Sequence, residues 1–313
     1  MAMILITHGL PGAGLEMLAG HQLIMPPPLT AFSRAEILSL IPKADAVIVG
    51  GLLDGEMIRR GRRLRVIANY GAGYDQVDVA EAAACGIPVT SIPEQVTAAT
   101  AELALGLMLA VSRRIGEMNL RLRLEEPSAL FGMGRNMGHG LAGQTLGILG
   151  LGRIGGAVAR LGRALGMEVL GFSRHGVDPA LAQPAPLEAL VTKADVLSLH
   201  CPLTPQTRGL VDAAMLARMK PGAMLINTAR GAIVDSDALA DALEAGRLAG
   251  AGLDVFPDEP NVPQRLLRLP QCVLTPHMGA NAAETREAML RACCRQILDV
   301  LEGRRPKNIV NGL

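Results

Sequence analysis

Three charged side chains, each placed just after a predicted strand, are the residues of this sequence best suited to chemistry. They are Arg230, Glu259 and His277, and each stands in a short segment of its own. A histidine titrates near neutral pH and can pass a proton, and a neighbouring carboxylate would stabilise its protonated form and fix its tautomer. A guanidinium can grip an anionic group and polarise a carbonyl. One such residue after a strand is usually structural, but three in order, each in its own motif, indicate a catalytic site.

A glycine-rich turn between a predicted strand and a predicted helix is the second feature with a chemical meaning. The strand begins at Leu146 and runs into a G-x-G-x-x-G motif made by Gly150, Gly152 and Gly155. The glycines permit a tight turn, let the backbone approach a pyrophosphate and allow close packing of helix on strand. The N-terminus of the following helix offers unpaired N–H groups to an anion. In a chain with 36 glycines the motif alone could arise by chance, but the flanking strand and helix predict a dinucleotide site.

The end of the next predicted strand, 168–172, selects the cofactor. An acidic residue there would bond the ribose 2′-hydroxyl of NAD, whereas an arginine accommodates the 2′-phosphate of NADP. The strand ends in Ser173 and Arg174, and the first acid downstream is Asp178. The guanidinium of Arg174 can donate two hydrogen bonds to a phosphate, and the hydroxyl of Ser173 can donate another. Arg174 could also be a solvated strand-end residue. The sequence favours NADPH, with NADH less favoured.

Short runs rich in Val, Ile and Leu alternate with helical stretches. These elements must position the candidate catalytic and cofactor-binding residues. Such runs are typical of parallel sheets buried on both faces, and they fall into two series that each predict a doubly wound α/β domain. The first series comprises 3–7, 22–25, 46–49, 66–69 and 88–91. The second comprises 146–150, 168–172, 196–200, 224–227, 251–255 and 273–275.

Three further segments connect or complete these series. The apolar spacing in 97–116 predicts a long bridging helix. Segment 120–143 contains Pro127, glycines at 132, 134, 138 and 140, and little periodicity, so we expect an irregular excursion and a subunit contact. A helical pattern at 284–301 comes too late for the second series and is expected to return to the first domain.

The sequence therefore predicts two domains. The first comprises 1–98 plus 283–313 and would bind the substrate. The second comprises 99–282 and would bind the dinucleotide, with 118–144 as a dimerisation excursion.

Composition excludes several classes of partner. Thirty basic and 29 acidic residues give a formal net charge of +1, so no strong field is present to hold nucleic acid or an anionic membrane. The longest apolar run, 103–112, is much shorter than the roughly 20 residues of a spanning helix. The five cysteines form no C-x-x-C and have no zinc-type spacing with histidine, which favours reduced core residues in the cytoplasm and predicts no metal site.

The segments around Arg230, Glu259 and His277, together with the turn at Gly150, closely resemble the D-isomer-specific 2-hydroxyacid dehydrogenase family over nearly the whole chain. The resemblance implies a Rossmann domain and a flavodoxin-like substrate domain with a cleft between them. It implies reduction of a 2-oxo acid with His277 as acid/base, Glu259 as its orienting partner and Arg230 as the clamp that holds the substrate.

The same resemblance implies further binding residues and a homodimer. The loop that contains Ala72 and Gly73 would hold the substrate carboxylate with backbone N–H groups, beside Arg230 and His277. The residues implied at the cofactor are Gly150, Gly152, Arg153, Ile154, Gly155, Ser173, Arg174, Cys201, Pro202, Thr207, Thr228, Ala229, Asp254 and Gly279. Asp254 would lie near the nicotinamide amide.

Within the family, Ser173-Arg174 and the loop around Gly73 look most like NADPH-dependent reductases of glyoxylate, hydroxypyruvate or 2-ketogluconate. Hydroxyphenylpyruvate reductases and NAD-dependent phosphoglycerate-type dehydrogenases are the alternatives among enzymes. The scarcity of aromatic residues, 2% of the chain, favours small or hydroxylated substrates. A nucleotide-sensing corepressor of the same fold is an alternative from another class. Such proteins carry long disordered tails and an acidic NAD-type strand end, and neither is visible here.

Overall fold

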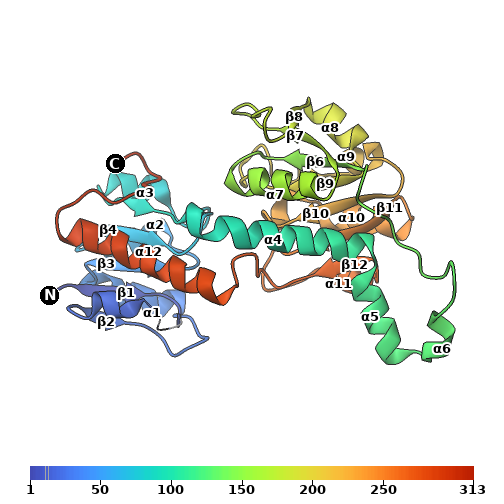
Figure 1. Cartoon of the computed structure of the whole chain (residues 1–313). Coiled ribbons are helices and arrows are strands. Elements are labelled where there is room, and N and C mark those ends of the chain that lie inside the picture. The colour runs from blue at the N-terminus through green and yellow to red at the C-terminus, as the bar shows by residue number, and fades with distance from the viewer. Residues whose placement is uncertain (11, 13) are drawn as a thin grey trace. The chain divides into compact units, whose positions relative to one another are not determined.

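The computed structural model describes residues 1–10, 12 and 14–313. They form two compact units, Met1–Val96 with Ala280–Leu313, and Thr97–Gly279. Figure 1 shows a sheet with surrounding helices in each unit. The sequence places the boundaries at 98/99 and 282/283, where the structure has 96/97 and 279/280. Positions 11 and 13 of the predicted first domain lie outside the described residues.

The first unit is built on a five-stranded sheet in the order β2-β1-β3-β4-β5, and all of its strand pairs are parallel. Its strands are β1 (Met3–Ile6), β2 (Gln22–Ile24), β3 (Ala46–Val49), β4 (Val66–Asn69) and β5 (Val89–Thr90). Every residue of β3 and β4 is buried, which explains their unbroken apolar runs.

The helices of the first unit begin at residues typical of helix N-termini. Ser33 and Glu36 form a reciprocal capping box at the start of α1, and the carboxylates of Asp54 and Asp78 cap α2 and α3. The helices are α1 (Arg34–Leu40), α2 (Gly55–Arg60), α3 (Val79–Ala84) and α12 (Ala283–Leu301), with single 3-10 turns at η1 (Leu15–Leu18) and η2 (Ile41–Lys43).

The C-terminal helix α12 returns to the first unit, which confirms the expectation for 284–301. Figure 1 shows it lying along β3 and β4. Its buried residues Met289, Cys293 and Ile297 pack with Ile4 and Ile48 of the sheet. The two adjacent cysteines of α12 are both free and fully buried, so they act as small core side chains.

The second unit contains a parallel seven-stranded sheet in the order β12-β11-β10-β9-β6-β7-β8. Its strands are β6 (Thr145–Leu149), β7 (Glu168–Phe172), β8 (Gln183–Pro184), β9 (Val196–Leu199), β10 (Ala223–Asn227), β11 (Leu248–Leu253) and β12 (Cys272–Leu274). The short strand β8 was not expected, because its two exposed residues give no apolar run. The remaining elements are α4 (Pro93–Ser112), α5 (Ile115–Leu124), α6 (Pro127–Leu130), α7 (Arg153–Ala164), α8 (Leu187–Lys193), α9 (Ala213–Arg218), η3 (Gly231–Ile233), α10 (Ser236–Glu244) and α11 (Gln264–Leu267).

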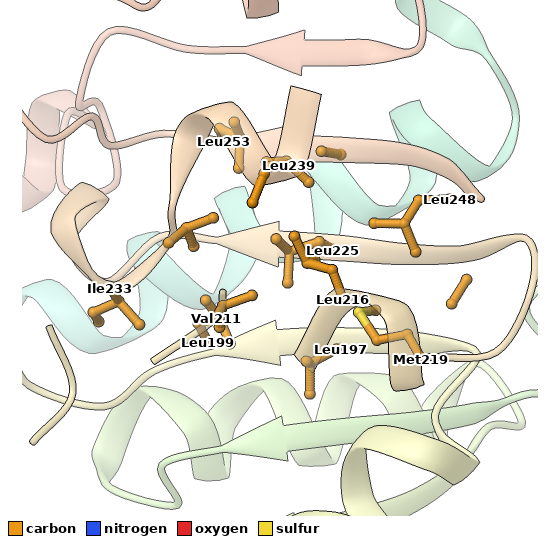
Figure 2. Close-up of a cluster of buried hydrophobic side chains, with 14 of the residues drawn as sticks. Leu197, Leu199, Val211, Leu216, Met219, Leu225, Ile233, Leu239, Leu248 and Leu253 are labelled. Carbon is orange, nitrogen blue, oxygen red and sulfur yellow. The ribbon is translucent and has the colours of Figure 1, made fainter. Parts of the chain in front are cut away.

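Apolar side chains cover both faces of this second sheet. On one face, Leu225 of β10 packs with Leu216 and Leu239 of the neighbouring helices, as Figure 2 shows. On the other face, Ile148 of β6 packs with Leu107 of α4. Within the described residues, α4 is the one helix long and apolar enough to cross a membrane, and half of that window is buried inside the protein, as in a core helix.

The expectation of an irregular segment at 120–143 is wrong for its first part. Helix α5 covers Ile115–Leu124 and α6 covers Pro127–Leu130. No residue of α5 is buried, so the helix has no apolar stripe for a sequence pattern to reveal. Charge pairs support it instead: Arg121 bonds Glu125 one turn away, with 2.7 Å between Nε and Oε1. The predicted long helix 97–116 ends earlier, at Ser112, because Arg114 adopts a left-handed backbone conformation.

Candidate active site

Three neighbouring strands of the second sheet deliver the three predicted catalytic residues to one edge. Strands β10, β11 and β12 are adjacent and parallel, so their carboxyl ends lie at the same side. Arg230 follows β10, Glu259 follows β11 and His277 follows β12. The carboxyl edge of a parallel sheet is where ligands bind in folds of this kind.

His277 and Glu259 form a hydrogen-bonded pair. The distance from His277 Nδ1 to Glu259 Oε2 is 2.7 Å, and Glu259 Oε1 accepts a hydrogen bond from the Phe256 N–H at 3.0 Å. Partial burial raises the pKa of Glu259, but the hydrogen bonds from His277 and Phe256 outweigh it and hold that pKa below its usual value. The ionised carboxylate therefore fixes Nδ1 as a donor, and Nε2 is left for a substrate.

A buried carboxylate anchors the loop that carries His277. Asp254 is 1% exposed, and its oxygens accept hydrogen bonds from Thr275 Oγ1 at 2.6 Å and from the N–H groups of Met278 and Gly279 at 2.8 Å. His277 itself has φ 50°, in the left-handed region that residues other than glycine seldom adopt. Burial raises the pKa of Asp254 against these hydrogen bonds. The structure therefore gives both Asp254 oxygens a role in shaping the histidine loop.

The side chain of Asn227, the last residue of β10, stabilises the loop that carries Arg230. Asn227 Nδ2 donates to the Arg230 carbonyl at 2.9 Å, and Asn227 Oδ1 accepts from the Ala229 N–H at 3.0 Å. A Cβ atom on Gly231 would lie 2.0 Å from the carbonyl carbon of Phe256, so only glycine lets this loop pass the Phe256 backbone. The charge of Arg230 also helps to lower the pKa of Glu259.

The glycine turn after β6 is tight, and the helix that follows it packs closely on the strand. Gly150 has φ 101°, and a Cβ atom there would lie 2.6 Å from Cys201 N. A Cβ atom on Gly155 would lie 2.0 Å from the Gly150 carbonyl oxygen, so helix and strand touch at this point. A Cβ atom on Gly152, in contrast, would enter open space. Helix α7 starts at Arg153, and Ile154 lies in its first turn.

The predicted cofactor-selecting residues, Ser173 and Arg174, directly follow β7. Ser173 Oγ accepts a hydrogen bond from the His175 N–H at 3.3 Å, and Arg174 is exposed. Burial raises the pKa of Cys201, and the charge of Arg174 acts against that shift. The Cys201 backbone lies against Gly150, so the charge of Arg174 acts on a residue that packs on the glycine turn.

The loop after β9 is held together by its own hydroxyls. Thr207 Oγ1 donates to the Pro202 carbonyl at 2.7 Å and accepts from the Thr204 N–H at 2.8 Å, so its side chain shapes the loop. Two buried atoms at this edge, Thr228 Oγ1 and His200 Nδ1, have no hydrogen-bond partner among the described residues. Burial lowers the pKa of His200 to about 4, so the ring stays neutral at physiological pH.

In the first unit, the loop after β4 exposes backbone donors. Asn69 Nδ2 donates to the carbonyl oxygens of Gly71 at 3.0 Å and Gly73 at 2.9 Å, so these two oxygens point toward Asn69. Among the described residues, nothing accepts from the N–H groups of Ala72 and Gly73. Two adjacent free N–H groups can hold a carboxylate.

Comparison with known proteins identifies the family. Residues 105–279 match the model of the D-isomer-specific 2-hydroxyacid dehydrogenase NAD-binding domain. The chain belongs to this family. It is 38% identical to a glyoxylate reductase of Thermococcus litoralis, with 98% of this chain and 96% of the relative covered. It is therefore an oxidoreductase acting on CH–OH donors, with an NAD-binding domain.

Solved structures show the same fold. A protein of Thermus thermophilus superposes with a TM-score of 0.92 at 42% identity, covering 98% of this chain and 99% of the other. An NADPH-dependent glyoxylate/hydroxypyruvate reductase of Sinorhizobium meliloti, in complex with NADP and malonate, superposes with a TM-score of 0.89 at 31% identity. That match covers 99% of this chain and 96% of the reductase. The two parallel sheets of this dehydrogenase are thus the two Rossmann-like domains of the family.

The residues at the glycine turn fit a dinucleotide. The open space beside Gly152 leaves the backbone accessible at the N-terminus of α7, where a pyrophosphate binds in such folds. The unpartnered hydroxyl of Thr228 offers a hydrogen-bonding group at the same sheet edge. A search of the described part of the chain finds no group of three or more His, Cys, Asp or Glu that could hold a metal ion.

Sequence reasoning gave no role to Asn227 or to the Phe256 N–H, and it did not foresee that Asp254 anchors the His277 loop. Asn227 was visible as a polar residue three positions before Arg230, and its type suggested a side chain that could bond a nearby backbone. The Phe256 N–H has no signal in sequence, because any residue type other than proline supplies the same donor.

Proposed function

We propose that this dehydrogenase catalyses NADPH-dependent reduction of a small 2-oxo acid to the D-2-hydroxy acid. The observation that carries the proposal is the His277–Glu259 pair, 2.7 Å apart, at the strand edge that also holds Arg230. The relatives named glyoxylate reductase and the solved glyoxylate/hydroxypyruvate reductase support the substrate class. Five free cysteines support a reducing, cytoplasmic setting.

Each group has one task in the proposed reaction. Bound NADPH would supply the hydride for the carbonyl carbon. His277 donates a proton to the oxygen that becomes the hydroxyl, and Glu259 stabilises its charged form. Arg230 bonds the substrate and stabilises negative charge on the reacting oxygen. The free N–H groups of Ala72 and Gly73 hold the substrate carboxylate.

A panel of 2-oxo acids tests this function. The purified protein is mixed with NADPH and, in turn, glyoxylate, hydroxypyruvate, pyruvate, 2-ketogluconate, hydroxyphenylpyruvate and 3-phosphohydroxypyruvate, and oxidation of NADPH is followed by its absorbance. We expect the highest kcat/KM with glyoxylate, hydroxypyruvate or 2-ketogluconate. A preference for one of the last two compounds would replace this substrate class.

The cofactor preference is proposed from Ser173 and Arg174. A 2′-phosphate near Arg174 would gain charge-assisted hydrogen bonds, and the end of β7 carries no carboxylate to repel it. The structure with NADP in the Sinorhizobium reductase supports this choice. The remaining cofactor contacts are proposed from Arg153, Ile154, Cys201 and the other residues at the carboxyl edge of the second sheet.

Replacing Arg174 with Ala tests the cofactor proposal. A hydrogen bond to a charged group contributes about 1.5–3 kcal/mol, so kcat/KM for NADPH should fall by about 10- to 100-fold. The value for NADH should change little, since NADH has no 2′-phosphate. Arg218→Ala, which removes an exposed charge on α9, is the matched control. Equal losses with both cofactors, or faster turnover of NADH by the unaltered protein, would contradict the assignment.

We also propose that the protein is a homodimer joined through residues 115–137. This segment exposes large apolar side chains, among them Leu124 at 75% and Phe131 at 72%. Exposed apolar side chains gathered in one segment of the chain mark interaction surfaces. The predicted dimerisation excursion, 118–144, falls on the same segment.

Sedimentation tests the dimer. The unaltered protein should sediment at twice its chain mass of 32.8 kDa, and the double variant Leu124→Glu, Phe131→Glu should shift toward one chain mass. Leu267→Glu, an exposed apolar position on α11, is the matched control and should remain dimeric. A concentration-independent monomer of the unaltered protein would refute the proposal.

A further inference from the structure

Five arginines fall within residues 59–65 of the first unit, and the proposed reaction gives them no role. They occupy positions 59, 60, 62, 63 and 65, and all five are exposed. The segment joins the end of α2 to the start of β4, so it lies at the amino edge of the first sheet. A run of like charges is usually a solvated face, and the contacts of each arginine therefore decide whether the run forms a site.

Two of the five arginines have partners within the fold. Arg63 donates to Asp45 Oδ1 from Nε at 3.2 Å and from Nη2 at 2.9 Å. Arg65 Nη2 donates to the Val300 carbonyl in the last turn of α12 at 2.9 Å. These bonds attach the segment to the residue before β3 and to the C-terminal helix. The other three arginines have different surroundings.

Those three arginines line one cavity at the amino edge of the sheet. Its volume is about 450 Å³, and its lining residues are Pro42, Glu56, Arg59, Arg60 and Arg62. We name it the amino-edge cavity. It lies where the chain enters the adjacent strands β3 and β4, and its volume falls in the usual range of small-molecule sites, about 300–1,000 Å³. Three arginines and one glutamate give the lining a net charge of +2.

Ion pairs around the amino-edge cavity leave positive charge for a ligand. Glu56 Oε2 accepts from Arg34 Nη2 at 2.6 Å, so a cation outside the lining already neutralises the one carboxylate of the lining. Glu56 Oε1 lies 3.1 Å from Arg60 Nη2. Arg59 pairs with an acid of α3. Among the described residues, the side chain of Arg62 has no ion pair or hydrogen bond.

Backbone hydrogen bonds fix the turn that carries Arg60 and Arg62. The Gly61 N–H donates to the Ile58 carbonyl at 3.0 Å, and the Arg62 N–H donates to the Arg60 carbonyl at 2.9 Å. The Leu64 N–H donates to the Gly61 carbonyl at 2.9 Å, and the Leu64 side chain is buried beneath the turn. A ligand therefore meets a backbone that is already ordered, which lowers the entropic cost of binding.

We propose that the amino-edge cavity binds a small phosphate-bearing anion, with Arg60 and Arg62 donating hydrogen bonds to its oxygens. A guanidinium matches two phosphate oxygens at once, and a phosphate group carries a charge of about −1.5 to −2 near neutral pH, close to the opposite of the lining. The hollow shape and the limited charge favour a small soluble anion over a nucleic acid or a membrane, which need an extended basic surface.

The amino-edge cavity is separate from the proposed substrate position. The loop that contains Ala72 and Gly73 follows the carboxyl end of β4, and the cavity adjoins the amino end of the same strand. The four residues of β4 span about 13 Å. The inference therefore does not depend on the proposed reaction, and each can fail without the other.

Isothermal titration calorimetry with inorganic phosphate tests the site. The full chain is first saturated with NADP⁺ to occupy the proposed dinucleotide site, and sodium chloride keeps the ionic strength constant. The double variant Arg60→Ala, Arg62→Ala should bind phosphate at least about 10-fold more weakly, the loss expected for a hydrogen bond to a charged group. Glu56→Gln should bind it about 2- to 5-fold more tightly, because it removes an exposed ion pair that competes for Arg60.

Controls separate loss of the site from loss of charge or of fold. The double variant Arg63→Ala, Arg304→Ala removes the same charge from the first unit outside the cavity lining and should keep the affinity of the unaltered protein. Thermal melts establish that each variant folds, and a damaged protein would not give the tighter binding expected of Glu56→Gln.

Three results would overturn the proposal. The first is the absence of phosphate binding by the unaltered protein, and the second is an equal affinity in the folded Arg60→Ala, Arg62→Ala variant. The third is tighter association with an RNA oligomer or with phosphatidylserine vesicles than with phosphate, lost in the same double variant. That result would make the arginine run a surface for a large polyanion.

Discussion

Replacing His277 with Asn is expected to lower kcat by about 10²- to 10⁴-fold, the usual contribution of a general acid. Asparagine is the informative choice because, unlike most residues, it tolerates the left-handed conformation that His277 adopts at φ 50°. The loop anchored by Asp254 should therefore keep its shape while the proton donor is lost. The measurement is steady-state oxidation of NADPH with saturating hydroxypyruvate, repeated from about pH 6 to about pH 9, on both sides of the usual range of a histidine.

The pH profile distinguishes a catalytic role from a structural one. The reducing activity of the unaltered enzyme should fall at alkaline pH, where a general acid is deprotonated, and the activity that remains in the variant should not show this fall. His139→Asn, an exposed histidine of the same unit, is the matched control and should retain full kcat. A His277→Asn protein with full activity and an unchanged profile would remove this residue from the mechanism.

Substitution of Arg230 should damage both KM and kcat. Arg230→Lys keeps the positive charge but loses the planar fork that bonds two oxygens at once. We expect kcat/KM to fall by about 10²- to 10³-fold, comparable to the loss of one donor to the reacting oxygen, and further in Arg230→Ala. Initial rates over a range of hydroxypyruvate concentrations, at fixed NADPH, give the two constants separately.

The matched control for this charge is Arg218→Lys, at an exposed ion pair with Glu188 on the surface of the same unit. It should leave both constants unchanged. If Arg230→Lys altered only the melting temperature, the side chain would have a structural role, which its bond from Nη1 to the Ala229 carbonyl could supply. A change in kcat alone would mean that Arg230 acts on the reacting oxygen without binding the substrate.

The positions of the proposed catalytic residues could be predicted because parallel strands impose a simple geometry. Once β10, β11 and β12 are read as neighbouring strands, their carboxyl ends must meet, and Arg230, Glu259 and His277 follow those ends. The glycine turn was predictable for a similar reason: Gly150 and Gly155 stand where backbone atoms pass too close for any side chain.

Features that depend on backbone atoms or on contacts far apart in sequence could not be predicted. Asp254 bonds N–H groups more than 20 positions away, and those donors look alike in every sequence. Helix α5 was not predicted, because none of its residues is buried and its sequence shows no helical periodicity of apolar residues.

The decisive experiment identifies the product formed when the protein, NADPH and hydroxypyruvate react to completion, with the two enantiomers resolved by chiral chromatography. We expect D-glycerate in an amount equal to the NADPH consumed, and a much lower initial rate when NADH replaces NADPH. Formation of L-glycerate, or no oxidation of NADPH in the presence of any small 2-oxo acid, would contradict the proposed reaction.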